Sequence, residues 1–162
     1  MTDAVQTRFV SLAPDSRPAP RTDFERALHK LLDDAFALEP VWATDIGFHA
    51  YDDRWPDLSE AGRQAELSMV RHHRARLATF DEANLPFNEQ IDLAVVRDFL
   101  DGWEFSEGVL RQYAWDPLSY IQQAGSGLFA LLAREYAPWR RSAAALPKDP
   151  RRCWRHCGQL TI

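Results

Sequence analysis

Apolar residues recur at spacings of three and four positions along most of the chain, which is the spacing of helices with one apolar face. The first such stretch holds Phe24, Leu28, Leu31, Leu32, Ala35 and Phe36. The segment Thr22–Glu25 has the Ser/Thr-x-x-Glu form, in which the two outer side chains satisfy each other's free backbone N–H groups. Pro40 disfavours helical geometry at Glu39. The pattern predicts a helix that begins at Thr22 and ends before Pro40.

The stretch from residue 39 to residue 59 connects two predicted helices and is dense in aromatic and acidic side chains. We expect a shaped connection, because so many large side chains require fixed neighbours. A short helical turn is predicted before Gly47, which supplies the left-handed residue that ends it. Asp57 and Ser59 are candidate caps for the helix that follows.

The helix after residue 59 is predicted to run to about Thr79. Its apolar stripe is predicted to consist of Leu58, Ala61, Ala65, Met69, Val70, Leu77 and Phe80. The remaining faces carry Arg63, Arg71, His72, Arg74 and Arg76. We interpret these basic residues as a solvated face rather than a binding patch.

Two further apolar stripes occupy the second half of the chain. Asn88 is the candidate cap of the first of them. Two glycines within residues 102–108 each cost about 1 kcal/mol relative to alanine in a helix interior, so we expect a bend or a close helix approach there. Asp116 and Pro117 are suited to the start of the last helix. Residues 125–127, Gly-Ser-Gly, are predicted to interrupt that helix as a hinge or close-packing point.

No stretch shows the sustained period-two alternation and β-branched enrichment of a strand. We therefore predict an all-α protein of five to six helices joined by short loops. Residues 1–21 contain three prolines and no periodicity, and we expect them to form a disordered lead-in.

The formal net charge of −5 argues against a nucleic-acid partner, because such binding depends on Lys and Arg neutralising phosphates. No apolar run reaches the roughly 18 residues of a membrane span, and the first residues lack the pattern of a signal peptide. We therefore expect no membrane partner and a cytoplasmic location. Residues 139–162 carry six basic residues against one acidic residue, and they also contain both cysteines.

The sequence contains no strong catalytic or metal-binding motif. No histidine is followed by glutamate, so the zinc-protease form His-Glu-x-x-His is absent from the sequence. Cys153 and Cys157 flank a histidine, but the surrounding arginines would repel a cation, and we predict no metal site there. We also find no Gly-rich phosphate loop.

His49, near Asp45, Asp52 and Asp53, forms the best local constellation. One interpretation is a histidine held by a carboxylate at a cleft, suited to proton transfer or substrate contact. The other, which we favour, is a histidine whose ring nitrogens fix the loop. A complete hydrolase that uses His49 with Asp52 is disfavoured, because no Ser or Cys nucleophile is visibly paired to them.

Three segments together resemble a known family. The first runs from Phe36 to Asp52 with the form Phe-x-x-x-Pro-x-x-Ala-Thr-x-x-Gly-x-His-x-x-Asp, followed by Asp-Leu-Ser at residues 57–59. The others are Trp-Asp-Pro-x-x-Tyr at residues 115–120 and Leu-Ala-Arg-Glu-Tyr-Ala-Pro at residues 132–138. Their order and content resemble the bacterial DUF885 proteins over residues 22 to about 148.

This resemblance implies an all-helical protein similar to zinc peptidases of the gluzincin type. Family members are longer, with their His-Glu metal motif in the C-terminal half, so zinc is implied for the full-length family and no cofactor for this chain. We expect the N-terminal part of a larger helical zincin-like fold, with residues 22–148 as the family region and no catalytic residue or activity of its own. His49, Asp52 and Tyr120 are the candidate substrate-cleft residues.

Two partner hypotheses follow from this expectation. In the longer proteins, the apolar stripes would face a C-terminal half. We therefore expect the partner to be that half, or a second copy of the chain through a self-associating apolar surface. The alternative function is a self-contained helical protein-interaction module, in which the stripes close on each other and the acidic surface recruits a partner.

Residues 149–162 form a basic tail in which the helical pattern is lost. The excess of Arg over Lys, 17 to 2, indicates G/C-rich codons. In such codons, an alternative frame across residues 152–158 reads Leu-Leu-Ala-Ala-Leu-Arg, an amphipathic helical continuation. We hypothesise that a frameshift replaced a helix with this aberrant tail.

Overall fold

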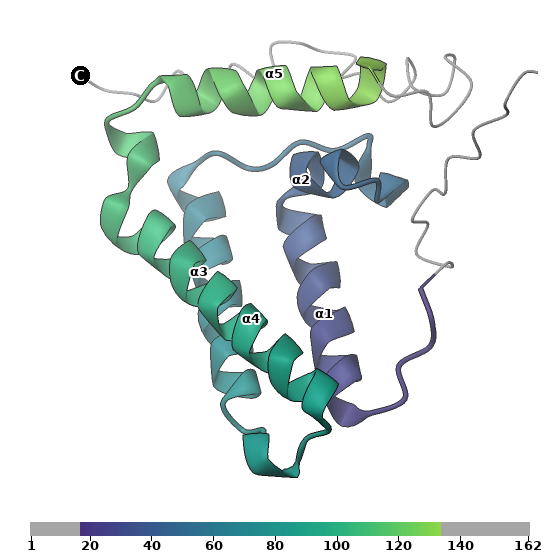
Figure 1. The fold of residues 1–162 in the computed structure, drawn as a ribbon. Coiled ribbons are helices and arrows are strands. Elements are labelled where there is room, and N and C mark those ends of the chain that lie inside the picture. Colours follow the sequence, from purple (N-terminus) through teal and green to yellow (C-terminus); the bar gives the residue numbers. More distant parts are fainter. Residues whose placement is uncertain (1–16, 134–162) are drawn as a thin grey trace, which may run out of the picture.

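The structure is a computed structural model that describes residues 17–133, and Figure 1 shows their arrangement. The α-helices are α1 (Asp23–Leu38), α2 (Pro40–Asp45), α3 (Glu60–Leu77), α4 (Phe87–Phe105) and α5 (Leu118–Ala133). Short 3₁₀ turns are η2 (His49–Tyr51), η3 (Glu82–Asn84) and η5 (Gln112–Ala114), and η4 (Ser106–Leu110) is a π-helix. Within the described range there is no strand, and the predicted all-α fold is confirmed.

The ends of the chain are only partly described. Residues 17–21 of the predicted lead-in are included, and there Arg17 forms an ion pair with Asp33 of α1. The rest of the lead-in and the tail predicted over residues 149–162 lie outside the described residues.

The start of α1 is the capping box that the sequence predicts. The backbone N–H of Glu25 donates to Thr22 Oγ1 at 3.0 Å, and the N–H of Thr22 donates to Glu25 Oε2 at 3.3 Å. Thr22 Oγ1 also donates to Glu89 Oε1 of α4 at 2.9 Å. This cap therefore begins the helix and ties it to a second helix.

Helices α1, α3 and α4 enclose the main core (Figure 1). The buried side chains of this core are Phe24, Ala27, Leu31, Val70, Leu77, Leu93 and Leu100. Each fully buried large apolar side chain contributes about 1.5 to 3 kcal/mol relative to an exposed one. Phe24 also meets the Phe80 ring edge-on, with centroids 5.4 Å apart.

A second cluster surrounds α2 and makes residues 39–59 a shaped connection. Phe36, Ala43 and Phe48 are buried there, with Trp42 and Tyr51 packed against them. Gly47 follows α2 with φ of 93°, in the left-handed region predicted for the end of this turn.

Helix α5 packs across α2 through a glycine. A Cβ on Gly127 would lie 2.9 Å from Trp55 Cη2 and 3.1 Å from Val41 Cγ2, so only glycine permits this approach. Close packing is one of the two roles predicted for residues 125–127, and the structure shows it at Gly127 but not at Gly125, where a Cβ would meet nothing within 4 Å. The predicted interruption is wrong, because α5 is continuous from Leu118 to Ala133.

Two other local predictions are corrected. Asn88 lies inside α4, whose N-cap is Pro86, because the Pro86 carbonyl accepts from the N–H of Gln90 at 3.0 Å. Gly102 makes no close approach, since a Cβ there would meet nothing within 4 Å. The irregularity expected near residues 102–108 is instead the π-helix η4, which ends at Arg111 with a left-handed φ of 49°.

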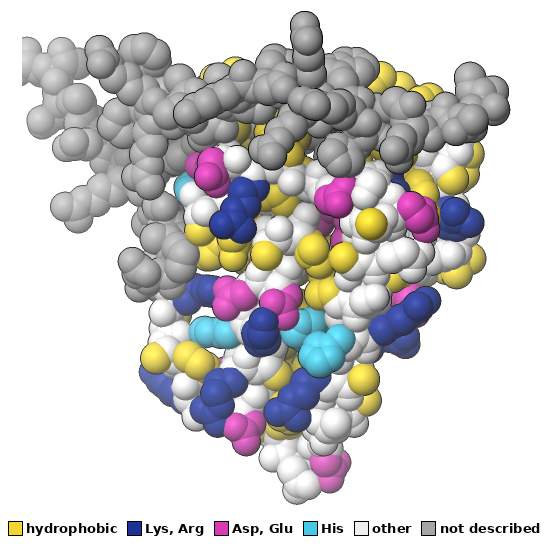
Figure 2. All heavy atoms as spheres, turned by 180° about the vertical axis from the view of Figure 1, so that it is seen from behind, with side chains coloured by type: hydrophobic (Ala, Val, Ile, Leu, Met, Phe, Trp, Pro, Cys, Tyr) yellow, Lys and Arg dark blue, Asp and Glu magenta, His cyan; other side chains and the backbone are white. Residues whose placement is uncertain are grey.

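The basic residues of α3 have divided roles. Arg71 and Arg74 are exposed and form ion pairs with Glu104 of α4, as expected for a solvated face. Figure 2 shows basic, acidic and histidine side chains interspersed over the lower part of one face. Among residues 17–133, no helix is long and apolar enough to span a membrane.

Candidate functional site

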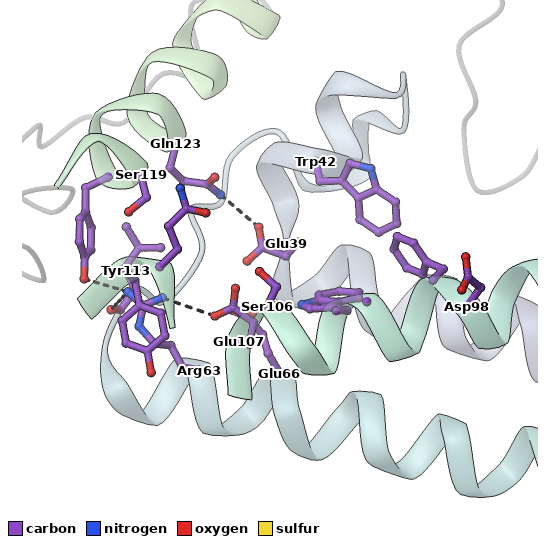
Figure 3. A pocket seen from close by; sticks show the side chains of 16 residues that line it. Glu39, Trp42, Arg63, Glu66, Asp98, Ser106, Glu107, Tyr113, Ser119 and Gln123 are labelled. Atoms are coloured by element: carbon purple, nitrogen blue, oxygen red, sulfur yellow. Dashed lines mark hydrogen bonds and ion pairs between the residues drawn. The ribbon is translucent and has the colours of Figure 1, made fainter. Parts of the chain in front are cut away.

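A pocket of about 600 Å³ lies where α3, the end of α4, η4 and the start of α5 meet beside the α1–α2 junction. Its charged and aromatic lining includes Glu39, Trp42, Arg63, Glu66, Glu107 and Tyr120. Figure 3 shows Glu39, Glu66 and Glu107 between Arg63 on one side and Trp42 on the other. No two of these six residues are neighbours in the chain, so the pocket exists only in the folded protein.

Arg63 is buried at one end of the pocket, with 8% of its surface exposed. Its Nη2 donates to the Leu58 carbonyl at 3.1 Å and to Tyr120 Oη at 3.0 Å. The guanidinium also lies 3.5 Å from the centroid of the Tyr113 ring, within range of a cation–π interaction. The interpretation of Arg63 as part of a solvated face is wrong, because the return of the chain through η5 and α5 covers it.

Three glutamates converge opposite this arginine from separate elements. Glu39 lies between α1 and α2, Glu66 is on α3 and is 7% exposed, and Glu107 is on η4. Glu39 accepts a hydrogen bond from Gln123 Nε2 of α5 at 3.1 Å. Glu107 Oε2 lies 3.9 Å from Arg63 Nη1. The pocket therefore gathers more negative than positive groups.

Burial perturbs the acidity of all three glutamates. Removal from water raises the pKa of Glu66 to about 8, and the adjacent negative charge of Glu39 adds to that effect. Burial also raises the pKa of Glu39 and that of Glu107. With a pKa of about 8, the Glu66 carboxyl group is mostly protonated at neutral pH, beside the Glu39 carboxyl group.

Aromatic rings form the wall nearest α2 and α4. Trp42 stacks on Phe99 with centroids 5.8 Å apart and meets Trp103 edge-on at 6.1 Å. Phe99 remains 44% exposed. A bound molecule would meet carboxyl groups and aromatic faces together.

The structure places the three predicted cleft residues in two different locations. Tyr120 lines the pocket and is held by Arg63. His49 and Asp52 are not among the lining residues. His49 Nδ1 lies 3.1 Å from Asp52 Oδ1, which also accepts from Thr44 Oγ1 at 2.8 Å. That geometry fits a histidine that fixes its loop, and a role in substrate contact stays a prediction for all three.

Sequence reasoning missed the buried charges of α3. The observed buried face holds Gly62, Arg63, Glu66, Leu67, Val70, His73 and Leu77, while Ala61 and Ala65 of the predicted stripe are exposed. The spacing of three or four residues that defines one face of a helix joins Arg63, Glu66, Val70 and His73 in succession. That periodicity is the signal in the sequence, but charged residues are rarely fully buried, so the period alone does not predict a buried face here.

Among residues 17–133, no three His, Cys, Asp or Glu side chains come together in a group that could hold a metal ion. The described residues therefore do not fit the zinc that the resemblance implies for longer proteins. We derive no chemical step through a metal from these side chains.

Within residues 17–133, the fold and pocket define an all-helical unit in which α5 packs back across α2 and closes an acidic, aromatic-lined pocket. Comparison with known proteins identifies the family: the chain belongs to DUF885, described as bacterial protein of unknown function, whose family model matches residues 40–149.

One solved structure is described as "a putative lipoprotein of unknown function from Shewanella oneidensis". It shares 28% sequence identity with this chain at a TM-score of 0.71, and the match covers 78% of this chain. The chain spans 23% of that protein's length. Among curated proteins, none matches.

Proposed function

We propose that this chain is the N-terminal helical region of a DUF885 zinc-peptidase-like protein, where it forms one wall of the substrate cleft and has no catalytic activity by itself. The observation that carries the proposal is that the match with the solved relative covers most of this chain but only a small part of that protein. Most of this chain, 78%, corresponds to only 23% of that chain. A helical unit of this kind supports a scaffold role within a larger protein.

The surface of α4, η4 and α5 supports the same proposal. Large apolar side chains remain exposed there, and we call them the α4–α5 apolar surface: Phe87, Val95, Phe105, Val109, Leu118, Ile121, Phe129 and Leu132. A folded domain seldom leaves so many apolar side chains in water without a partner. The partner in our proposal is the remaining part of a DUF885 protein, with self-association as the alternative.

Zinc belongs to the proposal only for longer family members. When bound in a gluzincin-type protein, zinc would polarise the scissile carbonyl and activate a water molecule. The contribution of the present chain would be to shape and wall the cleft, with Tyr120 and, as further candidates, His49 and Asp52.

The test combines DNA sequencing with an activity assay. The DNA is sequenced across codons 145–162 and several hundred codons beyond, and we expect an alternative frame that leads into a His-Glu metal motif. The chain as it stands should cleave no fluorogenic peptide, and the protein from the restored frame should bind zinc and cleave peptides. Peptide cleavage by the present chain, or the absence of such a frame, would contradict the proposal.

The alternative function is a self-contained helical interaction module in the cytoplasm. The closed core between α1, α3 and α4 favours it. This chain by itself buries the large side chains of that core, which include Phe24, Val70, Leu93 and Leu100. A monomer in light scattering that unfolds in one cooperative transition would support this function over a truncated region. Cell fractionation would test the cytoplasmic location.

A further inference from the structure

We propose that the pocket binds the side chain of a lysine or arginine residue of a peptide, with Glu66 and Glu107 as acceptors for its cationic group. This inference rests on the proposed function, because it names the substrate feature that this cleft wall would recognise. Three features of the pocket support it: its charge balance, its hydrogen-bond acceptors that lack donors, and its aromatic walls.

The charge balance favours a cation. Four acidic side chains line the pocket, Glu39, Glu66, Asp98 and Glu107, against the single base Arg63. Arg63 is already engaged by a backbone carbonyl, the Tyr120 hydroxyl and the Tyr113 ring. Its charge is thus held at one end of the pocket, and even with Glu66 protonated the remaining acidic groups outnumber the single base and favour a positive ligand.

The acceptors are buried without matching donors. Glu66 is more than nine-tenths buried, and the nearest charged influences on its carboxyl group include two other acids, Glu39 and Glu107. Glu107 Oε2 is buried and receives no hydrogen bond from the described residues, and its ion-pair partner, Arg63 Nη1, is 3.9 Å away, beyond hydrogen-bond distance. Buried carboxyl groups are ordinarily satisfied by donors, because an unsatisfied group costs about 1 to 3 kcal/mol. An ammonium or guanidinium group brings the missing N–H donors.

The aromatic walls suit the rest of such a side chain. Trp42, Phe99 and Trp103 form a continuous cluster beside the acids. Ring faces attract cations and also pack against the methylene groups of Lys and Arg. The volume of about 600 Å³ lies within the range of about 300 to 1,000 Å³ that is usual for small-ligand sites.

Proton release should accompany binding. Glu66 faces Glu39 from the α1–α2 junction, Arg63 on its own helix and Glu107 from η4. A bound cation favours the ionised form of the Glu39–Glu66 pair, so affinity should rise as the pH increases from 6 to 8.

The experiment is a calorimetric or NMR titration of the full chain with Nα-acetyl-lysine methylamide and Nα-acetyl-arginine methylamide. The matched neutral probes are the norleucine and citrulline analogues, and a glutamate analogue tests the opposite charge. We expect the cationic probes to bind at least about tenfold more tightly than their neutral counterparts. Equal binding of cationic and neutral probes, or tighter binding of the glutamate probe, would overturn the inference.

Variants locate the binding in the pocket. Glu66→Gln and Glu107→Gln should each weaken binding of the lysine probe about fivefold or more, while helical circular dichroism stays unchanged. The control Glu82→Gln alters an exposed glutamate of η3, outside the pocket, and should leave affinity unchanged. Unchanged affinity in both pocket variants would also overturn the inference.

The two proposals fail separately. If the restored frame yields a zinc peptidase but the chain binds none of the probes, only the inference that the pocket binds lysine or arginine side chains is overturned. Binding of the probes by a chain that lacks such a frame would support the pocket and contradict only the peptidase assignment.

Discussion

At the residue scale, the unusual feature is a set of buried charges on one face of α3. Arg63 is satisfied by oxygen atoms and an aromatic face, and His73 Nε2 lies 3.0 Å from Asp34 Oδ2. Glu66 differs, because its neighbour is another acid. A protein usually buries a charge only with a partner, and the raised pKa of Glu66, about 8, makes its protonation state depend on pH near neutrality.

The first prediction concerns stability and pH. The folded protein raises the pKa of Glu66 from 4.5 to about 8, so between these values the folded state binds more protons than the unfolded state. The free energy of unfolding should therefore fall as the pH rises from about 4.5 to about 8. Glu66→Gln should reduce this slope and raise stability at pH 8 by roughly 1 to 3 kcal/mol. Urea unfolding at pH 5, 6.5 and 8 measures both effects. If the unfolding free energy of the wild type and of Glu66→Gln changed equally with pH, the raised pKa of Glu66 would be refuted.

The second prediction concerns Thr22, which caps α1 and also donates to Glu89 of α4. Thr22→Ala should cost about 1 to 3 kcal/mol of stability, because it removes a cap and a tertiary hydrogen bond. The control Ser59→Ala removes only the cap of α3, whose side chain accepts from the N–H of Gly62 at 3.3 Å. Chemical denaturation should show a smaller loss for this control, and equal losses would mean that the bond to Glu89 contributes nothing.

At the element scale, α5 decides whether the pocket exists. It supplies Tyr120 to Arg63 and Gln123 to Glu39. Its contact with α2 depends on the absence of a side chain at Gly127. The packing of one helix therefore controls the geometry of charged groups on two others.

The third prediction tests this dependence. Gly127→Ala should displace α5 and destabilise the protein by about 1 to 3 kcal/mol, because the added Cβ overlaps Trp55. The matched control is Gly125→Ala in the same helix, where a Cβ meets nothing within 4 Å. This control should be neutral or stabilising by up to about 1 kcal/mol. Thermal unfolding measures both variants, and a neutral Gly127→Ala would show that α5 does not pack as described.

At the scale of the whole molecule, the chain has a closed core and an open surface. The core between α1, α3 and α4 is complete among the described residues, whereas the α4–α5 apolar surface meets water. The chain belongs to DUF885 and covers 23% of one solved relative. Our proposal is that the α4–α5 apolar surface packs against further protein.

The fourth prediction follows from that surface. The isolated chain should self-associate with increasing concentration, because association removes apolar side chains from water. Phe129→Glu should restore the monomer without lowering the melting temperature, since Phe129 is 69% exposed. Ser126→Glu, an exposed position of the same helix, is the control and should leave association unchanged. Sedimentation measures the mass, and a monomeric wild-type chain at high concentration would contradict the prediction.

The sequence alone determined the helices and most of their ends. Period and caps are local properties, so Thr22, Ser59 and Gly47 could be recognised without knowledge of the fold. The all-α class follows from the same signals. Tyr120 is a candidate cleft residue through the resemblance alone, and its place beside Arg63 could not be predicted from spacing.

Only the tertiary structure decided which face of α3 is buried, the continuity of α5 and the existence of the pocket. Each depends on groups distant in the chain: Arg63 is covered by tyrosines 50 or more positions away, and Glu66 faces Glu39 from another helix. The free energy of burying a charge is set by those neighbours and not by the local pattern. The helices are therefore local consequences of the sequence, and the acidic pocket is a consequence of how they pack.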